Sequence, residues 1–184
     1  MARRPSSSKS SASSQSGPSL AISAAGRRLG LVLLLFVWAF VLLSLIGFDV
    51  GDPPSHVKWP PNNPVHNWCG TLGAALAYWN IYYLGAGAWV FYALGGIVLL
   101  SGVVGTSLSH LALRMTGVTM LALCVAGFQA LLFKHTAALP DLPGGTIGSV
   151  GVEQLLIRFG PVGSAIWIGG MGIIGLVVAA DEWL

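Results

Sequence analysis

Charged residues and cysteines are the two things this sequence has little of. Only 8% of its 184 residues are Asp, Glu, Lys or Arg, whereas a soluble domain usually devotes roughly a quarter of its residues to these types. Nine basic and six acidic side chains cannot solvate the surface of a chain this long, so a water-soluble globule is excluded. The two cysteines, Cys69 and Cys124, lie in or beside different hydrophobic segments. This separation excludes a disulfide framework and a zinc cluster of any usual spacing.

Long apolar runs are what the sequence has instead, since 54% of its residues are hydrophobic. Residues 29–48 contain no charge, and a helix of that length rises about 30 Å, which matches the hydrocarbon thickness of a bilayer. The runs do not alternate between apolar and polar residues, as the strands of a membrane β-barrel do. The sequence therefore predicts an all-α, polytopic membrane protein.

Four transmembrane helices and two amphipathic interfacial helices are predicted. The crossings are expected at about residues 29–48, 86–105, 116–133 and 162–180, and the interfacial helices at about 67–84 and 151–159. Together they form one membrane domain over residues 29–184. Residues 1–28 contain ten serines and few bulky apolar side chains, a composition typical of a disordered cytoplasmic tail.

The interfacial helices are predicted from segment length and from amphipathic pattern. Residues 67–105 carry no charge over 39 positions, which is too long for one crossing and too short for two crossings with a turn. Tryptophan and tyrosine are frequent in the first half, and such side chains favour the headgroup level. In residues 151–159, apolar side chains recur at helical spacing opposite Glu153, Gln154 and Arg158.

The basic residues predict the orientation of the chain. Six lie in the segments predicted to face inward, and three, Lys58, Lys134 and Arg158, lie in those predicted to face outward. The positive-inside rule then places both ends in the cytosol and the proline-rich segment 49–66 outside. A cleaved signal peptide is the alternative for the first run, but its apolar core is longer than the roughly 7–15 residues expected. The pair Arg27-Arg28 is similar to a twin-arginine signal whose flanking pattern is incomplete. An uncleaved anchor is favoured.

Few residues are candidates for chemistry. His56 and His66, flanked by Asp49 and Asp52, have the side-chain types of a metal site, but they form no i,i+4 pair and lie in a proline-stiffened loop, which favours solvated histidines. His110, four residues before Arg114, is interpreted as part of a lipid-headgroup contact.

An enzyme or a transporter within the membrane finds little support. Ser101, Cys124 and Ser164 are possible nucleophiles, but no histidine, aspartate or lysine lies inside a predicted crossing to activate them. Gln129 is the most polar side chain within a helix, and a bridge between helices is favoured over a transport role. No catalytic residue, cofactor or metal ligand is predicted.

Glycines mark two of the predicted crossings. Gly95, Gly96, Gly102 and Gly105 lie in the second, and Gly169, Gly172 and Gly175 recur every three residues in the fourth. Small residues let helix backbones approach closely in lipid. Two interpretations stay open: packing within one chain, or contact between the protomers of a ring.

The order of these features resembles the N-terminal four-helix membrane region of FtsK/SpoIIIE-type bacterial DNA translocases. The residues that carry the resemblance are the run N-x-x-G-x-x-G-A, the glycine before the second crossing and the G-P-V-G that opens the fourth: Asn67, Gly70, Gly73, Ala74, Gly85, Gly160, Pro161 and Gly163. The resemblance covers roughly residues 26–180. It implies a septum-localised inner-membrane anchor that self-associates, contacts division-site membrane proteins and reaches DNA and ATP only through a tethered hexameric motor.

The chain departs from that family in lacking a motor. A phosphate-cradling loop needs the pattern G-x-x-x-x-G-K-[ST], and none of the three lysines, Lys9, Lys58 and Lys134, follows a glycine. We therefore expect a membrane anchor and assembly domain that is not itself an enzyme. The chain is either the N-terminal piece of a longer translocase or a freestanding relative. The alternative function is a small transporter or channel subunit, with a membrane-embedded enzyme third.

Overall fold

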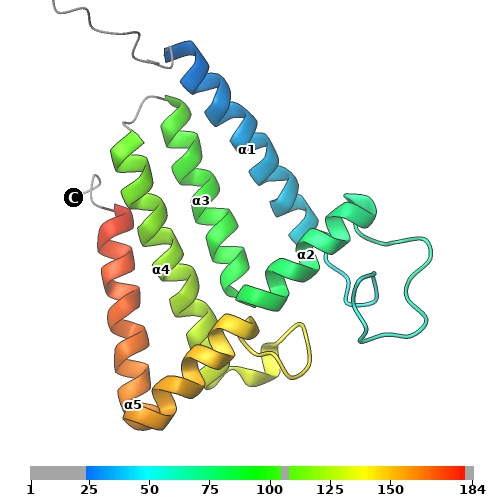
Figure 1. Cartoon of the computed structure of the whole chain (residues 1–184), viewed down its shortest axis with the longest axis vertical. Coiled ribbons are helices and arrows are strands. Elements are labelled where there is room, and N and C mark those ends of the chain that lie inside the picture. The colour runs from blue at the N-terminus through cyan, green and yellow to red at the C-terminus, as the bar shows by residue number, and fades with distance from the viewer. Residues whose placement is uncertain (1–23, 105–107, 181–184) are drawn as a thin grey trace, which may run out of the picture.

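All regular elements are helices in the part that the structure describes, residues 24–104 and 108–180 of a computed structural model (Figure 1). The elements are α1 (Ala24–Ile46), α2 (Gly70–Leu84), α3 (Gly87–Val104), α4 (Leu108–Leu132), the 3-10 helix η1 (Lys134–Thr136) and α5 (Gly145–Ala180). Most of the predicted tail, residues 1–23, lies outside the described residues, and 24–28 belong to α1.

Four of these helices are long and apolar enough to cross a membrane. The candidate spans are Gly26–Ile46, Gly87–Val104, His110–Leu132 and Gly145–Ala180. The predicted fold class, an all-α protein with four transmembrane helices, is confirmed. That α2 and the first part of α5 lie in the membrane interface stays a prediction.

Three helices begin earlier than the sequence predicted. α1 begins at Ala24 rather than Leu29, α4 at Leu108 rather than Thr116, and α5 at Gly145 rather than Gly151. Hydropathy marks the stretch that lipid can solvate, whereas backbone hydrogen bonds continue wherever neighbouring residues favour a helix. The segment before the third crossing is therefore a helical extension of it, whereas the segment before Gly160 is joined to the fourth crossing at a kink.

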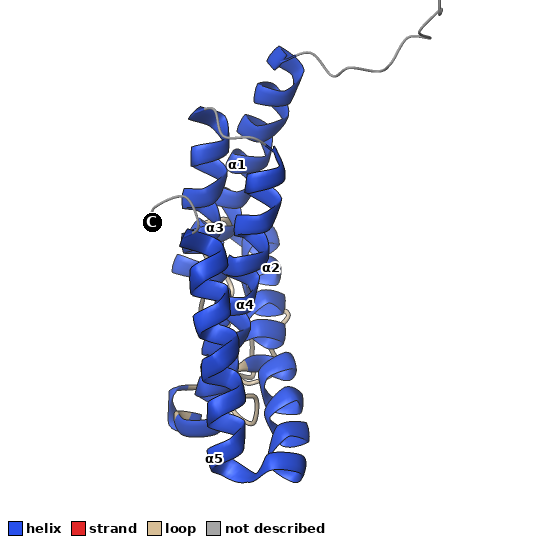
Figure 2. Cartoon of the chain, turned by 90° about the vertical axis from the view of Figure 1, so that its left-hand side faces the viewer, coloured by secondary structure: helices blue, strands red, loops and turns tan. Residues whose placement is uncertain are grey.

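The crossing helices form a single row rather than a closed bundle. In the described residues α1 contacts α3, α3 contacts α4 and α4 contacts α5, whereas the backbone of α1 comes close to neither α4 nor α5 and that of α3 does not come close to α5. The two views agree, since the helices stand side by side in Figure 1 and the molecule is thin in Figure 2. α1 and α5 are therefore the edges of the row.

Glycines and one tryptophan hold neighbouring helices of the row together. The indole Nε1 of Trp38 on α1 donates a hydrogen bond to the Tyr92 carbonyl on α3 at 2.8 Å. The ring of Trp38 occupies the notch beside Gly95, where an added Cβ would lie 2.5 Å from Cζ2. Between α4 and α5, a Cβ on Gly172 would lie 2.6 Å from the Cys124 sulfur. Close approach of this kind is how helices pack in lipid.

The glycine positions favour one of the two interpretations left open by the sequence. Gly95, Gly102, Gly172 and Gly175 are buried against neighbouring helices of the same chain. Gly169 is less enclosed, since the atom nearest to a Cβ added there is a Phe128 carbon at 3.8 Å. Gly105 lies outside the described residues. Packing within the chain therefore accounts for those four buried glycines.

Two helical segments run crosswise to the row (Figure 1). They are α2 and the part of α5 that precedes Gly160, and they contact each other. The Thr146 hydroxyl of α5 donates a hydrogen bond to the Tyr82 carbonyl of α2 at 3.0 Å. Each segment leads into a crossing helix, so the chain repeats the same plan twice.

Candidate functional site

Most of the buried polar side chains lie toward one end of the row, where α1 and α4 finish and α3 begins. In the described residues these are Ser44, Asp52, Ser55, Asn67, Gln129 and Ser164, while Arg114 lies toward the opposite end. Buried polar groups are hydrogen-bonded in folded proteins because leaving them unpaired is costly. Their partners therefore identify which segments this end holds in place.

Asn67 joins the end of α1 to the start of α2. Its side-chain amide donates to the carbonyls of Ser44 and Gly47 at 2.8 and 3.1 Å, and its Oδ1 accepts from the Cys69 amide at 2.9 Å. The last carbonyls of a helix have no partner inside the helix. Asn67, which is only 4% exposed, supplies that partner and so fixes how the chain leaves α1.

Asp52 holds the loop between α1 and α2 together. Its Oδ1 accepts from the Asn62 side chain at 2.9 Å and from the His66 amide at 3.0 Å, and its Oδ2 accepts from the Asn67 amide at 2.8 Å. The side chain is 2% exposed. A carboxylate in this position gives several N–H donors of the loop an acceptor.

Asp49 and His66 lie beside Asp52, and the three are the residue types that bind divalent cations. One ligand atom from each lies within 4.8 Å of the other two. His66 Nδ1 is 3.0 Å from Asp49 Oδ2. The Gly51 amide donates to Asp49 Oδ1 at 2.7 Å, and this bond, followed by that of His66, lowers the pKa of Asp49. Both oxygens of Asp52 already accept hydrogen bonds, so the cluster is explained as a loop closure.

The structure places only one of the two loop histidines, His66, beside the aspartates. His66 contacts both aspartates, whereas His56 is exposed and takes no part in the cluster. His110, interpreted from the sequence as part of a headgroup contact, lies on α4 toward the opposite end of the row and is exposed.

The glycine and alanine of the N-x-x-G-x-x-G-A run let α2 approach α1. A Cβ on Gly73 would come within 2.6 Å of Asn67 Oδ1 and 2.9 Å of the Ser44 hydroxyl. Ala74 is 3% exposed. Gly70 is the first residue of α2 and is exposed. The run thus combines the Asn67 amide, which binds the end of α1, with small residues on α2 that let the two helices pack closely.

Gly85 makes the turn from α2 into α3. Its φ of 52° and ψ of −132° belong to a region that L side chains rarely adopt. A Cβ there would also lie 2.5 Å from the Gly144 carbonyl carbon and 2.7 Å from Gln129 Oε1. Both the backbone conformation and the close neighbours require glycine at this position.

Gln129 joins three segments that are distant in sequence. Its Oε1 accepts from the amides of Ala86 and Gly144 at 2.8 and 3.0 Å, and its Nε2 donates to the Thr136 carbonyl at 3.2 Å. These contacts connect α4 with the start of α3, with η1 and with the approach to α5. The role is the bridging one that the sequence favoured over transport.

Gly160 makes the second turn of the repeated plan. It has φ 67° and ψ −178° inside α5, so the helix is two helices joined at a kink. Pro161 follows and suits the first turn of the second helix because it lacks an amide N–H. The Ser164 hydroxyl donates to the Gly160 carbonyl at 2.7 Å. Gly163 lies close to Phe159, whose Cβ would be 2.8 Å from an added Cβ.

The candidate nucleophiles have structural partners. The Ser101 hydroxyl donates to the Val98 carbonyl at 2.7 Å, and Ser164 bonds the Gly160 carbonyl. Cys124 packs beneath Gly172. Hydroxyls bonded back to their own helix are a common way to satisfy a polar group in lipid.

Sequence reasoning missed the part that Asp52 and Ser44 play. In the sequence, Asp52 is only an acid beside the loop histidines, and Ser44 is one residue of an apolar run. The sequence carried a weak signal for Asp52, namely an aspartate followed by two prolines, which is typical of a fixed turn. It carried none for Ser44.

One comparison with known proteins identifies a related family. The family described as the 4TM region of DNA translocase FtsK/SpoIIIE matches residues 23–182. Neither the curated proteins nor the solved structures yield a match. The matched range includes every helix described above, together with both glycine turns and the Asn67 contacts.

Proposed function

Because this chain belongs to the family of the 4TM region of DNA translocase FtsK/SpoIIIE, we propose that it is the membrane anchor and assembly domain of a DNA translocase that acts in chromosome segregation and cell division. The motor that would bind ATP and DNA is not part of this chain. The family match over residues 23–182 is the observation that carries this proposal. The chain is a multi-pass membrane protein with four candidate spans, which is what an anchor requires.

The proposed mechanism is positional rather than chemical. An anchor confines a tethered motor to a surface and so raises its effective concentration there. The polar contacts of Asn67, Asp52 and Gln129 support this mechanism because they fix the turns between helices and leave few internal degrees of freedom. A rigid anchor transmits position to whatever it tethers.

The proposed partners are further copies of the chain and membrane proteins of the division site. The single row of helices supports self-association because α1 and α5 each pack on one neighbouring crossing helix only, within the described residues. In the candidate span of α1, 22% of the residues are buried within the chain. A ring built from such rows pairs the α1 edge of one protomer with the α5 edge of the next.

The proposed location is the bacterial plasma membrane at the division septum, with both ends of the chain in the cytosol. The placement of basic residues supports this orientation through the positive-inside rule. Lys58 and Lys134 then lie outside, in the loop between α1 and α2 and in η1.

Two amide side chains within the helices that a transport path would use, those of Asn80 and Gln129, have partners within the chain. The Asn80 amide donates to the Leu76 carbonyl of its own helix at 2.8 Å. Gln129 lines a pocket of about 80 Å³ and is bonded to backbone groups of three segments. These contacts favour the anchor over a small transporter or channel subunit.

Two experiments test the proposed function. A fluorescent fusion of the chain, expressed in a rod-shaped bacterium, is expected to concentrate at division septa. An even distribution around the envelope would contradict the septal anchor. Sequencing the gene beyond codon 184 is expected to reveal a G-x-x-x-x-G-K-[ST] loop in the same frame. An authentic stop codon directly after Leu184 would count against a tethered motor.

A further inference from the structure

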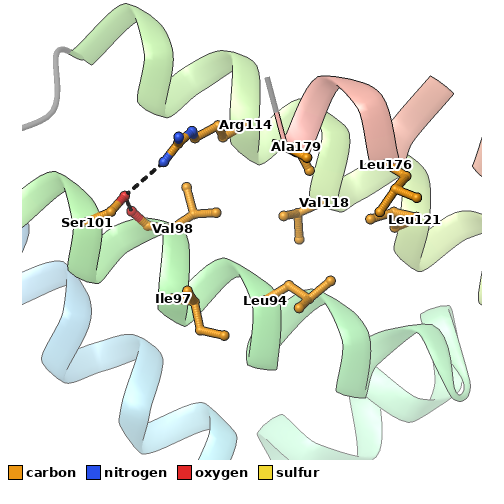
Figure 3. A pocket seen from close by; sticks show the side chains of 10 residues that line it. Leu94, Ile97, Val98, Ser101, Arg114, Val118, Leu121, Leu176 and Ala179 are labelled. Atoms are coloured by element: carbon orange, nitrogen blue, oxygen red, sulfur yellow. Dashed lines mark hydrogen bonds between the residues drawn. The ribbon is translucent and has the colours of Figure 1, made fainter. Parts of the chain in front are cut away.

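A buried arginine lies in a groove at the opposite end of the row from the polar contacts described above. Arg114 of α4 is only 6% exposed. The groove has a volume of about 240 Å³ between α3, α4 and the end of α5, and Figure 3 shows its lining, which also includes Leu94, Val98, Ser101, Val118 and Leu176. Every side chain that lines it, apart from Ser101 and Arg114, is aliphatic.

The polar and apolar parts of the groove are separated along its length. In Figure 3 the guanidinium of Arg114 and the hydroxyl of Ser101 lie together at one end, and Nη1 is 3.5 Å from Oγ. Leu94, Leu121 and Leu176 lie toward the other end. A ligand that matches this lining has an anionic group at one end and a hydrocarbon chain at the other.

The polar end of the groove lies close to the end of the membrane span. The candidate span of α4 begins at His110, and Arg114 follows four residues later. Four residues of helix rise about 6 Å, so the long arginine side chain lies within reach of the headgroup level. A cation buried at that depth between transmembrane helices marks a functional site or a lipid contact.

The charges at this end of the row are favourable for an anion. Arg27 and Arg28 near the start of α1 lie toward the same end as Arg114. In the described residues, all acidic side chains lie in the loop after α1 or between the end of α4 and Gly160, toward the opposite end of the row. Basic pockets between transmembrane helices bind acidic lipid headgroups.

We propose that this groove binds an acidic phospholipid, with the lipid phosphate on Arg114 and Ser101 and one acyl chain along α3, α4 and α5. The five N–H donors of a guanidinium suit phosphate and leave room for other contacts of Arg114 within the chain. The groove is smaller than a typical drug-sized pocket, which suits part of one acyl chain. A larger apolar hollow of about 590 Å³, lined by Met120, Ile166 and Ile174 among others, has no charged side chain and is not assigned a headgroup.

The test is a lipid-binding measurement on the purified full chain in neutral detergent by native mass spectrometry. The probes are dioleoylphosphatidylglycerol, dioleoylphosphatidylcholine and inorganic phosphate. We expect the wild type to retain phosphatidylglycerol in preference to phosphatidylcholine and to show weak phosphate binding. Arg114→Gln is expected to weaken phosphatidylglycerol binding about tenfold, since a hydrogen bond to a charged group contributes about 1.5 kcal/mol. Arg114→Lys keeps the charge and is expected to retain most of the binding.

Matched controls separate the groove from general surface charge. Arg28→Gln removes an exposed charge at the same end of the row and is expected to change the affinity less than twofold. Leu94→Trp fills the groove and is expected to weaken the lipid without affecting free phosphate. Leu100→Trp, on an exposed position of α3 that does not line the groove, is its control. Circular dichroism confirms that each variant is folded.

Several results would overturn the proposal. The first is equal retention of the two lipids by the wild type, and the second is an equal effect of Arg114→Gln and Arg28→Gln. The third is phosphate binding that is as strong as lipid binding and insensitive to Leu94→Trp, which would indicate a free-anion site.

The sequence places Asp181 and Glu182 directly after Ala180, which lines the groove. The Asp181→Asn, Glu182→Gln double variant is expected to keep or strengthen lipid binding, and loss of binding in it would contradict the proposal.

Discussion

Replacing Asn67 by aspartate is the sharpest test of how the turn between α1 and α2 is held. The substitution preserves size and the Oδ1 acceptor for the Cys69 amide. It removes the two donations to the carbonyls of Ser44 and Gly47 and sets a carboxylate against them. An aspartate is acceptor-only when ionised, so the carbonyls of Ser44 and Gly47 lose this partner.

The expected magnitude follows from these contacts. Each lost hydrogen bond costs about 1 kcal/mol, and a buried group left without a partner adds about 1–3 kcal/mol. The sum for Asn67→Asp is about 3–5 kcal/mol of unfolding free energy. Asn67→Ala loses the same two donations and also the acceptor for the Cys69 amide, so its expected cost is at least as large.

The assay is reversible unfolding of the purified chain in mixed micelles with increasing dodecyl sulfate, followed by circular dichroism. Asn80→Asp is the matched control, because the Asn80 amide donates to a carbonyl of its own helix, that of Leu76, and not to the end of α1. Its expected cost is about 1 kcal/mol or less. Equal unfolding midpoints for Asn67→Asp and Asn80→Asp would refute the claim that Asn67 holds the end of α1.

Three further predictions concern the turns and the loop. Gly85→Ala is expected to lower the unfolding free energy by about 3 kcal/mol or more, from backbone strain and steric overlap. Gly160→Ala, with nothing within 4 Å of an added Cβ, is expected to lower it by about 1–2 kcal/mol. The same unfolding assay ranks the two variants, and the reverse order would disprove the steric account. Gln129→Leu leaves two amides without an acceptor and is expected to cost about 2 kcal/mol or more, so an unchanged midpoint would remove Gln129 from the turn contacts. Because the pKa of Asp49 is lowered in the folded chain, the stability it contributes is present above about pH 4 and is lost as the pH falls through that lowered pKa. The amide resonance of Gly51 is expected to report this loss, and Asp49→Asn to abolish it; a pH response that survives the substitution would contradict the assignment.

The crossings were predictable because each is a local property of the sequence. Uncharged runs of the right length identified all four, and the single glycines at residues 85 and 160 marked the turns that precede two of them. The predicted start of α4 was wrong, because the residues before Thr116 are helical although they are more polar than the crossing itself.

The contacts between segments were not predictable, because they join residues far apart in the chain. Asn67 bonds a carbonyl 23 residues earlier, and Gln129 bonds an amide 43 residues earlier. Nothing in the local pattern around Asp52 indicates that it is buried. The single row of helices also depends on which small residues face each other, a relation that no one segment contains.

The most direct test of the central claim, that the chain crosses the membrane four times with both ends on one side, is cysteine labelling in intact cells. Cys69 and Cys124 are first replaced by alanine, and single cysteines are then placed at Ser13, Lys58 and Lys134. A membrane-impermeant maleimide is expected to label Lys58→Cys and Lys134→Cys in intact cells, and Ser13→Cys only after permeabilisation. Labelling of Ser13→Cys from outside, or of Lys58→Cys and Lys134→Cys from opposite sides, would contradict the account.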